Sequence, residues 1–332
     1  MSTTYYSGPG KVYFNSVGLQ AAGENGQIVA TLDEKTDPVA TAQFGRIGET
    51  LADQTVKVSV TPFDNWGLLA TLFPAFLGVT VASTAGVLVI GTRPHGASNL
   101  PLKIYTPDGR LYPFVRAAVT KHPDIKLGPG QGLFGAVEFT CLGDPAKNPG
   151  DSAFLVTGNA ITGPAAGDSG TTASDPGGAF TMSDFVRGNW TGAWGTLAGF
   201  GGDGGSALQA EDFWTITTEV KYSPLTVQKV TRHMKLDSVS FMAKARLVGP
   251  THTQLLTELL SHTSGSLFGS NTNAADLVLT GPSSKTVTLK QSEIKGAGFE
   301  FGGTKLGNGE LGFVTGMTFI AGAPQPLVVF SA

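Results

Sequence analysis

The sequence predicts an α+β fold in which antiparallel sheet dominates: two tandem copies of a β-sandwich or half-barrel, each with one short flanking helix. The 332-residue chain has 46 glycines and only 14% charged residues, a composition that suits short strands joined by tight turns. Two equally long blocks begin with Lys-Leu-Gly and end with glycine, KLGPGQGLFGAVEFTCLG at 126–143 and KLGNGELGFVTGMTFIAG at 305–322. Upstream of them lies another matched pair, DNWGLLATLF at 64–73 and THTQLLTELL at 251–260. Because both pairs keep their order over a whole-domain spacing, we expect a duplicated domain.

The predicted boundaries follow this repeat and a change in composition. Residues 1–143 form the first domain and residues 183–324 the second, each long enough to bury its own core. Residues 144–182 are rich in Gly, Pro, Ser, Asp, Ala and Thr, which predicts a linker or long surface loop. Residues 325–332 predict a C-terminal arm that adds as a strand to a neighbouring sheet edge.

In the first copy, alternation marks the clearest strand. TVKVSVT at 55–61 places its three valines on one face and Lys57 on the other, as a half-buried strand requires. A helix over 64–73 follows, because Asp64 can cap its first turn and leucines recur at helical spacing. The other strands of this copy are predicted at 11–14, 29–37, 87–91, 101–107, 112–120 and 133–142.

The second copy repeats this order. Thr251 can cap a helix over 251–260, and the apolar stripe of each helix is expected to cover its own sheet. The stripe residues are Leu68, Leu69 and Leu72 in the first helix and Leu255, Leu256 and Leu259 in the second. The strands of the second copy are predicted at 190–197, 212–222, 238–248, 277–281, 286–290, 296–302 and 311–320.

Charge and targeting signals exclude several classes of function. A net charge of −3 leaves no basic footprint for gripping DNA phosphates. Cys141 is the only cysteine, so no intrachain disulfide forms, and we expect a small buried side chain there. No stretch approaches the roughly 20 apolar residues of a membrane-spanning helix. The first residues lack the features of a signal peptide, so we expect a soluble product made in a cytoplasm.

No group of residues carries a catalytic or metal-binding pattern. GDSG at 167–170 matches the nucleophile segment of trypsin-like proteases, but it lies in the predicted linker without a placed His and Asp. The five histidines form no metal-ligand spacing. Adjacent carboxylates such as Asp33 and Glu34 point to opposite faces of a strand and cannot converge on one bond. We therefore expect no enzyme activity, no metal and no cofactor.

Each copy combines a glycine-flanked first strand, a strand that leads into the helix (through TPFDNW in the first copy), that one short helix, and a closing strand of the LFGAVEFT type. This order, over residues 5–143 and 185–322, resembles the tail tube (major tail) proteins of long-tailed bacteriophages. The resemblance implies that subunits join their sheets side by side into a ring whose inner wall is a continuous β-barrel. Stacked rings would form the tube through which DNA leaves the capsid.

Typical members of that family have one such domain per chain and form rings of six. A chain with two domains would therefore form trimeric rings with pseudo-sixfold symmetry. The implied partners are further copies of this chain and other phage tail proteins, while DNA passes through the lumen without specific binding and no membrane is bound. The implied location is the virion tail, assembled in the host cytoplasm.

Two sets of residues follow as candidate sites from this resemblance. The strands 53–61 with 133–142, and their counterparts 238–248 and 311–320, are expected to line the lumen. The candidate lumen or sheet residues are Val56, Lys57, Val58, Val60, Glu138, Phe139, Lys244, Arg246 and Thr318. The candidate contacts between rings are Tyr5, Tyr6, Leu327, Val328, Val329 and Phe330.

Two other interpretations remain open from the sequence. One is a different structural protein of a virion or surface, such as a tail terminator, a decoration protein or an adhesin-like β-protein. The other is a carbohydrate-binding or hydrolytic β-protein that uses the tryptophan-rich stretch 190–214, although tryptophans are more often core or subunit-contact residues.

Overall fold

The structure is a computed structural model of the whole chain, and it is nearly all β-strand in the residues that it describes. The antiparallel β character of the predicted fold is confirmed, but its α+β class is not supported by the described residues, in which the one helical element with described bounds is the short 3-10 turn Pro282–Ser284 (η3). Of the predicted helices 64–73 and 251–260, only Trp66 lies among the described residues. The described residues are 10–14, 17–20, 28–62, 66, 87–89, 100–106, 111–130, 132–144, 154, 187–195, 207–227, 230–248, 275–299, 308–315, 319–320, 323–324 and 326–331.

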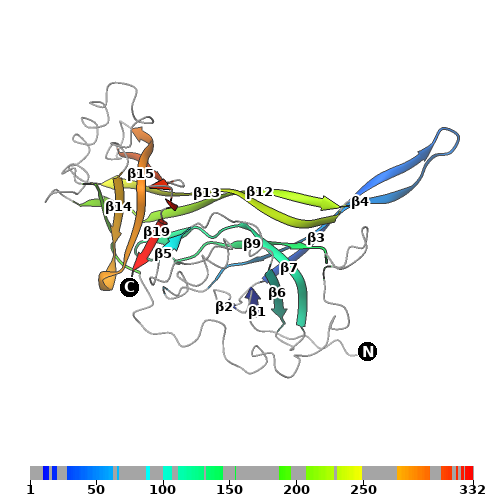
Figure 1. Cartoon of the computed structure of the whole chain (residues 1–332), viewed down its shortest axis with the longest axis horizontal. Coiled ribbons are helices and arrows are strands. Elements are labelled where there is room, and N and C mark those ends of the chain that lie inside the picture. Colours follow the sequence, from blue (N-terminus) through cyan, green and yellow to red (C-terminus); the bar gives the residue numbers. More distant parts are fainter. Residues whose placement is uncertain are drawn as a thin grey trace.

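The first sheet has seven antiparallel strands in the order β2-β1-β6-β7-β9-β4-β3 (Figure 1). Its core forms because strand alternation puts apolar residues on one face: Val58 and Phe139 are fully buried, whereas the Lys57 side chain is 45% exposed. The alternation predicted for 55–61 is thus confirmed. The strands are β1 (Lys11–Phe14), β2 (Val17–Gln20), β3 (Ile28–Thr41), β4 (Gly45–Val60), β6 (Leu100–Tyr105), β7 (Leu111–Lys121) and β9 (Val137–Leu142).

The second sheet closes on itself. The pairings run from β10 to β14, β15, β16, β13 and β11 and return to β10, so six strands form a small barrel. Trp214, Phe241 and Phe313 fill its core and are fully buried. The strands are β10 (Thr191–Trp194), β11 (Leu208–Ala210), β12 (Trp214–Val227), β13 (Val230–Val248), β14 (Ala275–Thr280), β15 (Thr286–Phe299) and β16 (Asn308–Thr315).

Seven strands of each sheet share one pairing order. The path β2-β1-β6-β7-β9-β4-β3 of the first sheet corresponds, strand for strand, to β11-β10-β14-β15-β16-β13-β12 of the second. Phe139 of β9 pairs with Val58, and Phe313 of β16 pairs with Ala243. The block alignment of the sequence instead matches Phe139 with Thr318, so it is shifted along the chain relative to the strand pairing.

The two units exchange segments rather than separating at one boundary. β5 (Val87–Val89) and β8 (Ile125–Leu127) come from the first half of the chain. They pair with β19 (Pro326–Ser331) and β12 of the second sheet, respectively. In the predicted linker, Phe154 is buried in the first core, and its carbonyl accepts a hydrogen bond of 2.9 Å from the Val115 amide.

The predicted C-terminal arm is also part of the second unit. β19 (Pro326–Ser331) pairs with β15 of the same chain, and Val328 and Phe330 are buried in the second core. A short separate ribbon joins β17 (Phe319–Ile320) to β18 (Ala323–Pro324).

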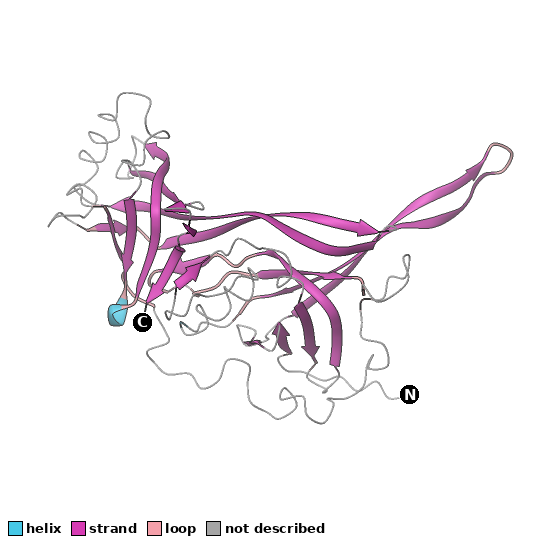
Figure 2. Ribbon diagram, in the orientation of Figure 1, coloured by secondary structure: helices cyan, strands magenta, loops and turns pink. Residues whose placement is uncertain are grey.

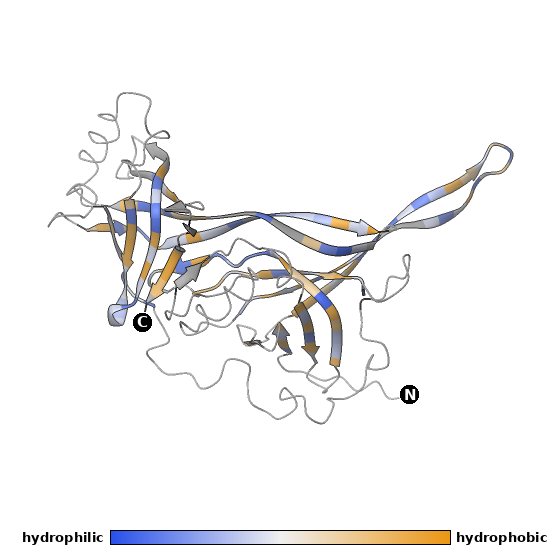
Figure 3. Cartoon of the chain, in the orientation of Figure 1, coloured by the Kyte–Doolittle hydropathy of each residue, from blue (hydrophilic) through white to orange (hydrophobic). Residues whose placement is uncertain are grey.

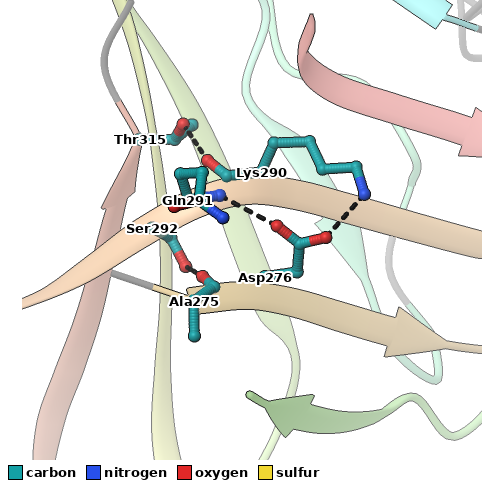
Figure 4. A network of polar contacts seen from close by, with 6 residues as sticks. All are labelled: Ala275, Asp276, Lys290, Gln291, Ser292 and Thr315. Atoms are coloured by element: carbon teal, nitrogen blue, oxygen red, sulfur yellow. Dashed lines mark hydrogen bonds and ion pairs between the residues drawn. The ribbon is translucent and has the colours of Figure 1, made fainter. Parts of the chain in front are cut away.

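The predicted strands 286–290 and 296–302 belong to a single strand, β15, as far as Phe299. The chain bends at Gln291, whose φ of 47° is left-handed. Asp276 supports this bend, because it accepts hydrogen bonds from the Gln291 amide at 3.0 Å and from Lys290 Nζ at 2.5 Å (Figure 4). Thr315 Oγ1 donates to the Lys290 carbonyl at 2.5 Å, which ties β16 to the same point.

Two long hairpins extend from the sheets (Figure 2). The hairpin β12–β13 lies beside the first sheet, while β3–β4 projects beyond it, at the end of the molecule opposite the barrel strands β14 and β15 (Figure 1). Figure 3 shows hydrophobic and hydrophilic residues interspersed along both hairpins. They are the part of the fold that the sequence pattern did not predict at full length.

Candidate assembly interface

The two hairpins are built alike, down to their irregularities. In β3–β4 the register shifts after Lys35 and again after Val39; in β12–β13 it shifts after Lys221 and again after Leu225. Across the strands, Ala30 of β3 is aligned with Phe139, and Ile216 of β12 is aligned with Phe313. In each hairpin the first register shift comes five residues after this aligned residue, and the second shift comes nine residues after it. Because a β-bulge bends a strand and increases its twist, matched bulges give the two hairpins the same course.

The hairpins also hold the exposed apolar surface. All seven large apolar side chains that are exposed in the described part of the chain lie on them. They are Val29, Leu32, Val39, Phe44 and Ile47 on β3–β4, and Leu225 and Val227 on β12–β13. Phe44 is 75% exposed, at the turn of the projecting hairpin. Exposed apolar side chains gathered in this way are typical of surfaces that contact another protein.

The hairpin β12–β13 already has a partner, the first sheet of its own chain. It lies against β4, β7 and β9. The Gly143 amide donates to the Thr231 carbonyl at 3.1 Å, and Arg232 donates to the Asp144 carbonyl. Arg232 occupies the second bulge and is only 8% exposed, so this bulge directs a long side chain into the contact.

A histidine and a tyrosine meet at the same junction. His122, just after β7, has its Nε2 atom 3.3 Å from the Tyr222 hydroxyl on β12. Burial lowers the pKa of His122 from 6.5 to about 3, because a charged imidazole would lose its hydration there. Burial likewise raises the pKa of Tyr222. Both side chains are therefore neutral at pH 7, and the junction suits an uncharged imidazole.

The hairpin β3–β4 has no such cover. Every residue from Val29 to Thr50 is exposed. Its described polar contacts are within the hairpin, such as Gln54 donating to Glu34 at 2.7 Å and Lys57 lying 3.8 Å from Asp33. Exposed pairs of this kind add little stability, and a two-stranded hairpin alone is marginal in water.

The sequence-predicted lumen residues divide between two faces. Val58, Val60 and Phe139 are buried in the first core, so they cannot line a channel. Val56 is half-buried and packs against the same core. The strand pairs themselves are present, because β4 pairs with β9 and β13 pairs with β16.

The predicted charged lumen residues lie on the other face, away from the cores. Lys244 is 3.3 Å from Glu310, and Arg246 is 3.0 Å from Glu211. Lys57 and Glu138 occupy alternate positions to the buried residues of β4 and β9. Three of these four charges are thus paired with a residue of opposite sign, counting the Lys57 pair above.

Other predicted site residues fall outside the described residues or inside the fold. Thr318, Tyr5, Tyr6 and the leucines of both predicted helices are not among the described residues. Leu327 lies in β19, Val329 is half-buried, and Val328 and Phe330 are core residues, which removes those two from the candidate contacts between rings.

The tryptophans form no exposed stacking surface. Trp66, Trp190, Trp194 and Trp214 are all buried, at 0–5% exposure, in the second core. Trp194 Nε1 donates to the Ser292 carbonyl at 3.0 Å. This arrangement removes the basis for the carbohydrate-binding interpretation, since a sugar platform needs accessible rings.

Two further features of the described residues carry no chemistry. A hollow of about 220 Å³ lies between β8, β10, β11 and residues 211–213, and this volume is small for a ligand site. Cys141 is buried, and burial raises the pKa of its thiol well above the ordinary value, so the reactive thiolate is not favoured.

Within the described residues, no group of three or more His, Cys, Asp or Glu side chains could hold a metal ion. The same residues contain no helix that is both long and apolar enough to span a membrane. A scan against protein-family models found no match, and a search of curated proteins found no relative. The candidate function therefore depends on the two hairpins and the repeated topology.

Proposed function

We propose that this chain is a structural virion protein that self-assembles into stacked rings and forms a bacteriophage tail tube. One observation carries the proposal: the same seven-strand pairing order occurs twice, with hairpins that bulge at the same positions. This match supports a duplicated domain. A chain with two equivalent units can take two neighbouring places in one symmetric ring.

The exposed surfaces support assembly rather than a monomeric role. β2 and β3 end the first sheet as unpaired edges in the described part of the chain, and the projecting hairpin carries five exposed apolar side chains. Natural proteins cover such edges, because they otherwise pair with other chains and aggregate. Three copies in a ring would supply six units and cover these surfaces.

The overall charge suits a conduit for DNA. The chain carries a net charge of −3, so a tube built from it has no excess of positive charge to bind phosphates. DNA would then pass along the wall of the tube without being held.

Electron microscopy and native mass measurement of the purified protein test this proposal. The expected particles contain three 34.3-kDa chains per ring, with a central channel, and stack into tubes. Monomers at every concentration, or trimers without a channel, would contradict it. Trimers without a channel would instead favour a decoration or adhesin-like protein.

A further inference from the structure

The in-chain contact of one hairpin indicates what the other hairpin contacts. On the outward face of the first sheet, Thr140 of β9 is 5% exposed and its neighbour Ala118 of β7 is fully buried. This is the sheet against which β12–β13 lies. The face turned away from the first core is thus a covered surface.

The equivalent face of the barrel is more open. Counted from the paired phenylalanines, the counterpart of Thr140 is Val314 of β16, and the counterpart of Ala118 is Glu293 of β15. Both Val314 and Glu293 are half-buried, although they occupy the places that are buried in the first sheet. The barrel therefore presents an uncovered version of the same docking surface.

The hairpin β3–β4 has the shape that would fit this barrel face, but it cannot reach the barrel of its own chain. β3–β4 follows the course of β12–β13, but it projects from the end of the molecule opposite the barrel (Figure 1). The occupant must therefore be the hairpin of another copy.

Charge favours the same pairing. Residues 28–60 contain five acidic and three basic residues, a net charge of −2. The strands of the barrel face, residues 241–248, 286–299 and 308–315, contain two acidic and four basic residues, a net charge of +2. Opposite potentials steer association and set its register.

We propose that the hairpin β3–β4 of one copy lies across the barrel face formed by β13, β16 and β15 of a neighbouring copy. The contact repeats between chains the one that β12–β13 makes within a chain. In a ring, every first sheet would then be covered by the hairpin β12–β13 of its own chain. Every barrel would be covered by the hairpin β3–β4 of the neighbouring chain. This inference rests on the proposed self-assembly and adds the surfaces that perform it.

Zero-length carbodiimide cross-linking of isotope-mixed particles tests the contact. Equal amounts of labelled and unlabelled chain are unfolded together, refolded, assembled and cross-linked, and the peptides are identified by mass spectrometry. Mixed-isotope links are expected between carboxylates of 28–60 and amines of the barrel face, such as Lys244. The in-chain pairs Lys57–Asp33 and Lys290–Asp276 give single-isotope links and serve as internal controls.

The outcomes separate this inference from the proposed function. Rings whose mixed links join residues 28–60 to the first sheet, or that give none from this hairpin, overturn the inference and leave the tail tube standing. Absence of any ring overturns the proposed function itself.

A pair of variants provides a second measurement. Val314→Asp changes the proposed acceptor face and should reduce assembly at least tenfold while the monomer stays folded. Val115→Asp, on β7 of the first sheet and outside the proposed contact, serves as the matched half-buried control and should assemble as the original chain does. Equal assembly of both variants would also overturn the inference.

Discussion

At the scale of single residues, Phe139 and Phe313 occupy the same place in their two sheets. Phe313 is fully buried, and its ring centroid lies 6.2 Å from the rings of both Trp194 and Trp214. From the sequence, Phe139 is one of the candidate lumen or sheet residues, whereas the structure buries it in the first core. Its equivalence with Phe313 could not be predicted, because the aligned blocks match Phe139 with Thr318.

Phe313→Ala should lower the free energy of unfolding by about 3–5 kcal/mol, the usual cost of a cavity left by a core phenylalanine. Equilibrium unfolding in urea, followed by tryptophan fluorescence, measures it. Phe44→Ala is the matched control: this side chain is 75% exposed, so the monomer should change by less than about 0.5 kcal/mol. Equal effects at both positions would contradict the assignment of the core.

Acid should destabilise the junction through His122. Its pKa is about 3 in the folded chain and 6.5 in a model peptide, so the unfolded chain binds the proton first as pH falls. The contribution of neutral His122 to the free energy of unfolding is fully present above pH 6.5. It is lost as the pH falls from 6.5 to 3, at up to about 1.4 kcal/mol per pH unit.

Urea unfolding at pH 7 and pH 5 tests the sign and size of this effect. The chain should lose about 2 kcal/mol more than His122→Gln over that interval, in which carboxylates remain mostly ionised. All other titratable groups are the same in both proteins, so the difference between them isolates His122. The same loss in both would exclude the effect.

At the scale of elements, strand positions could be predicted, but hairpin length could not. The pattern at 55–61 is visible because one face of that segment packs on a core. Residues 36–52 show no such alternation, since neither face of the projecting part is buried in this chain, and Pro38, Gly45 and Gly48 interrupt the pattern.

One further signal was present and would have identified the hairpins. TLDEKTDPV at 31–39 and TTEVKYSPL at 217–225 share Thr, Lys and Pro at the same spacing. They align the two copies in the register that the bulges follow, whereas the Lys-Leu-Gly blocks do not. The two predicted helices cannot be compared with the structure in the same way, because Trp66 is the one residue of those segments that it describes.

Replacing residues 36–52 by Asn-Gly should abolish assembly and leave the monomer stable. Lys35 and Asp53 are directly paired, so a two-residue turn can join them. Thermal unfolding by circular dichroism and electron microscopy of the same sample measure the two properties. The cores contain none of the deleted residues, so loss of the fold would contradict their assignment to a projecting hairpin.

The equivalent truncation, residues 222–237 replaced by Asn-Gly between Lys221 and Ser238, gives the contrast. It removes Tyr222 and Arg232, which contact the first sheet within the chain. The monomer itself should then lose about 1–3 kcal/mol, because buried polar partners are left unsatisfied.

At the scale of the whole molecule, the two units differ in charge. They also differ in how far the outward face of each sheet is covered. The net charge of −3 conceals a net charge of −2 on the hairpin 28–60 and a net charge of +2 on the barrel-face residues 241–248, 286–299 and 308–315. Composition alone gives the net charge, but it could not show this internal asymmetry. That asymmetry acts between chains if each acidic hairpin meets a basic barrel wall.

Assembly should therefore weaken as salt increases. The screening length falls from about 10 Å at 0.1 M to about 3 Å at 1 M ionic strength, which removes attraction between surface charges. Light scattering of assembling protein measures the yield of tubes at each salt concentration.

Asp37→Lys brings the hairpin to a net charge of zero, so this variant should assemble less at low salt and respond less to added salt. Asp212→Lys changes an exposed aspartate outside the hairpin by the same amount and should keep the original salt response. If the two variants behave alike, the charge of the hairpin does not direct assembly, and the apolar residues at its turn and bulges must supply the attraction.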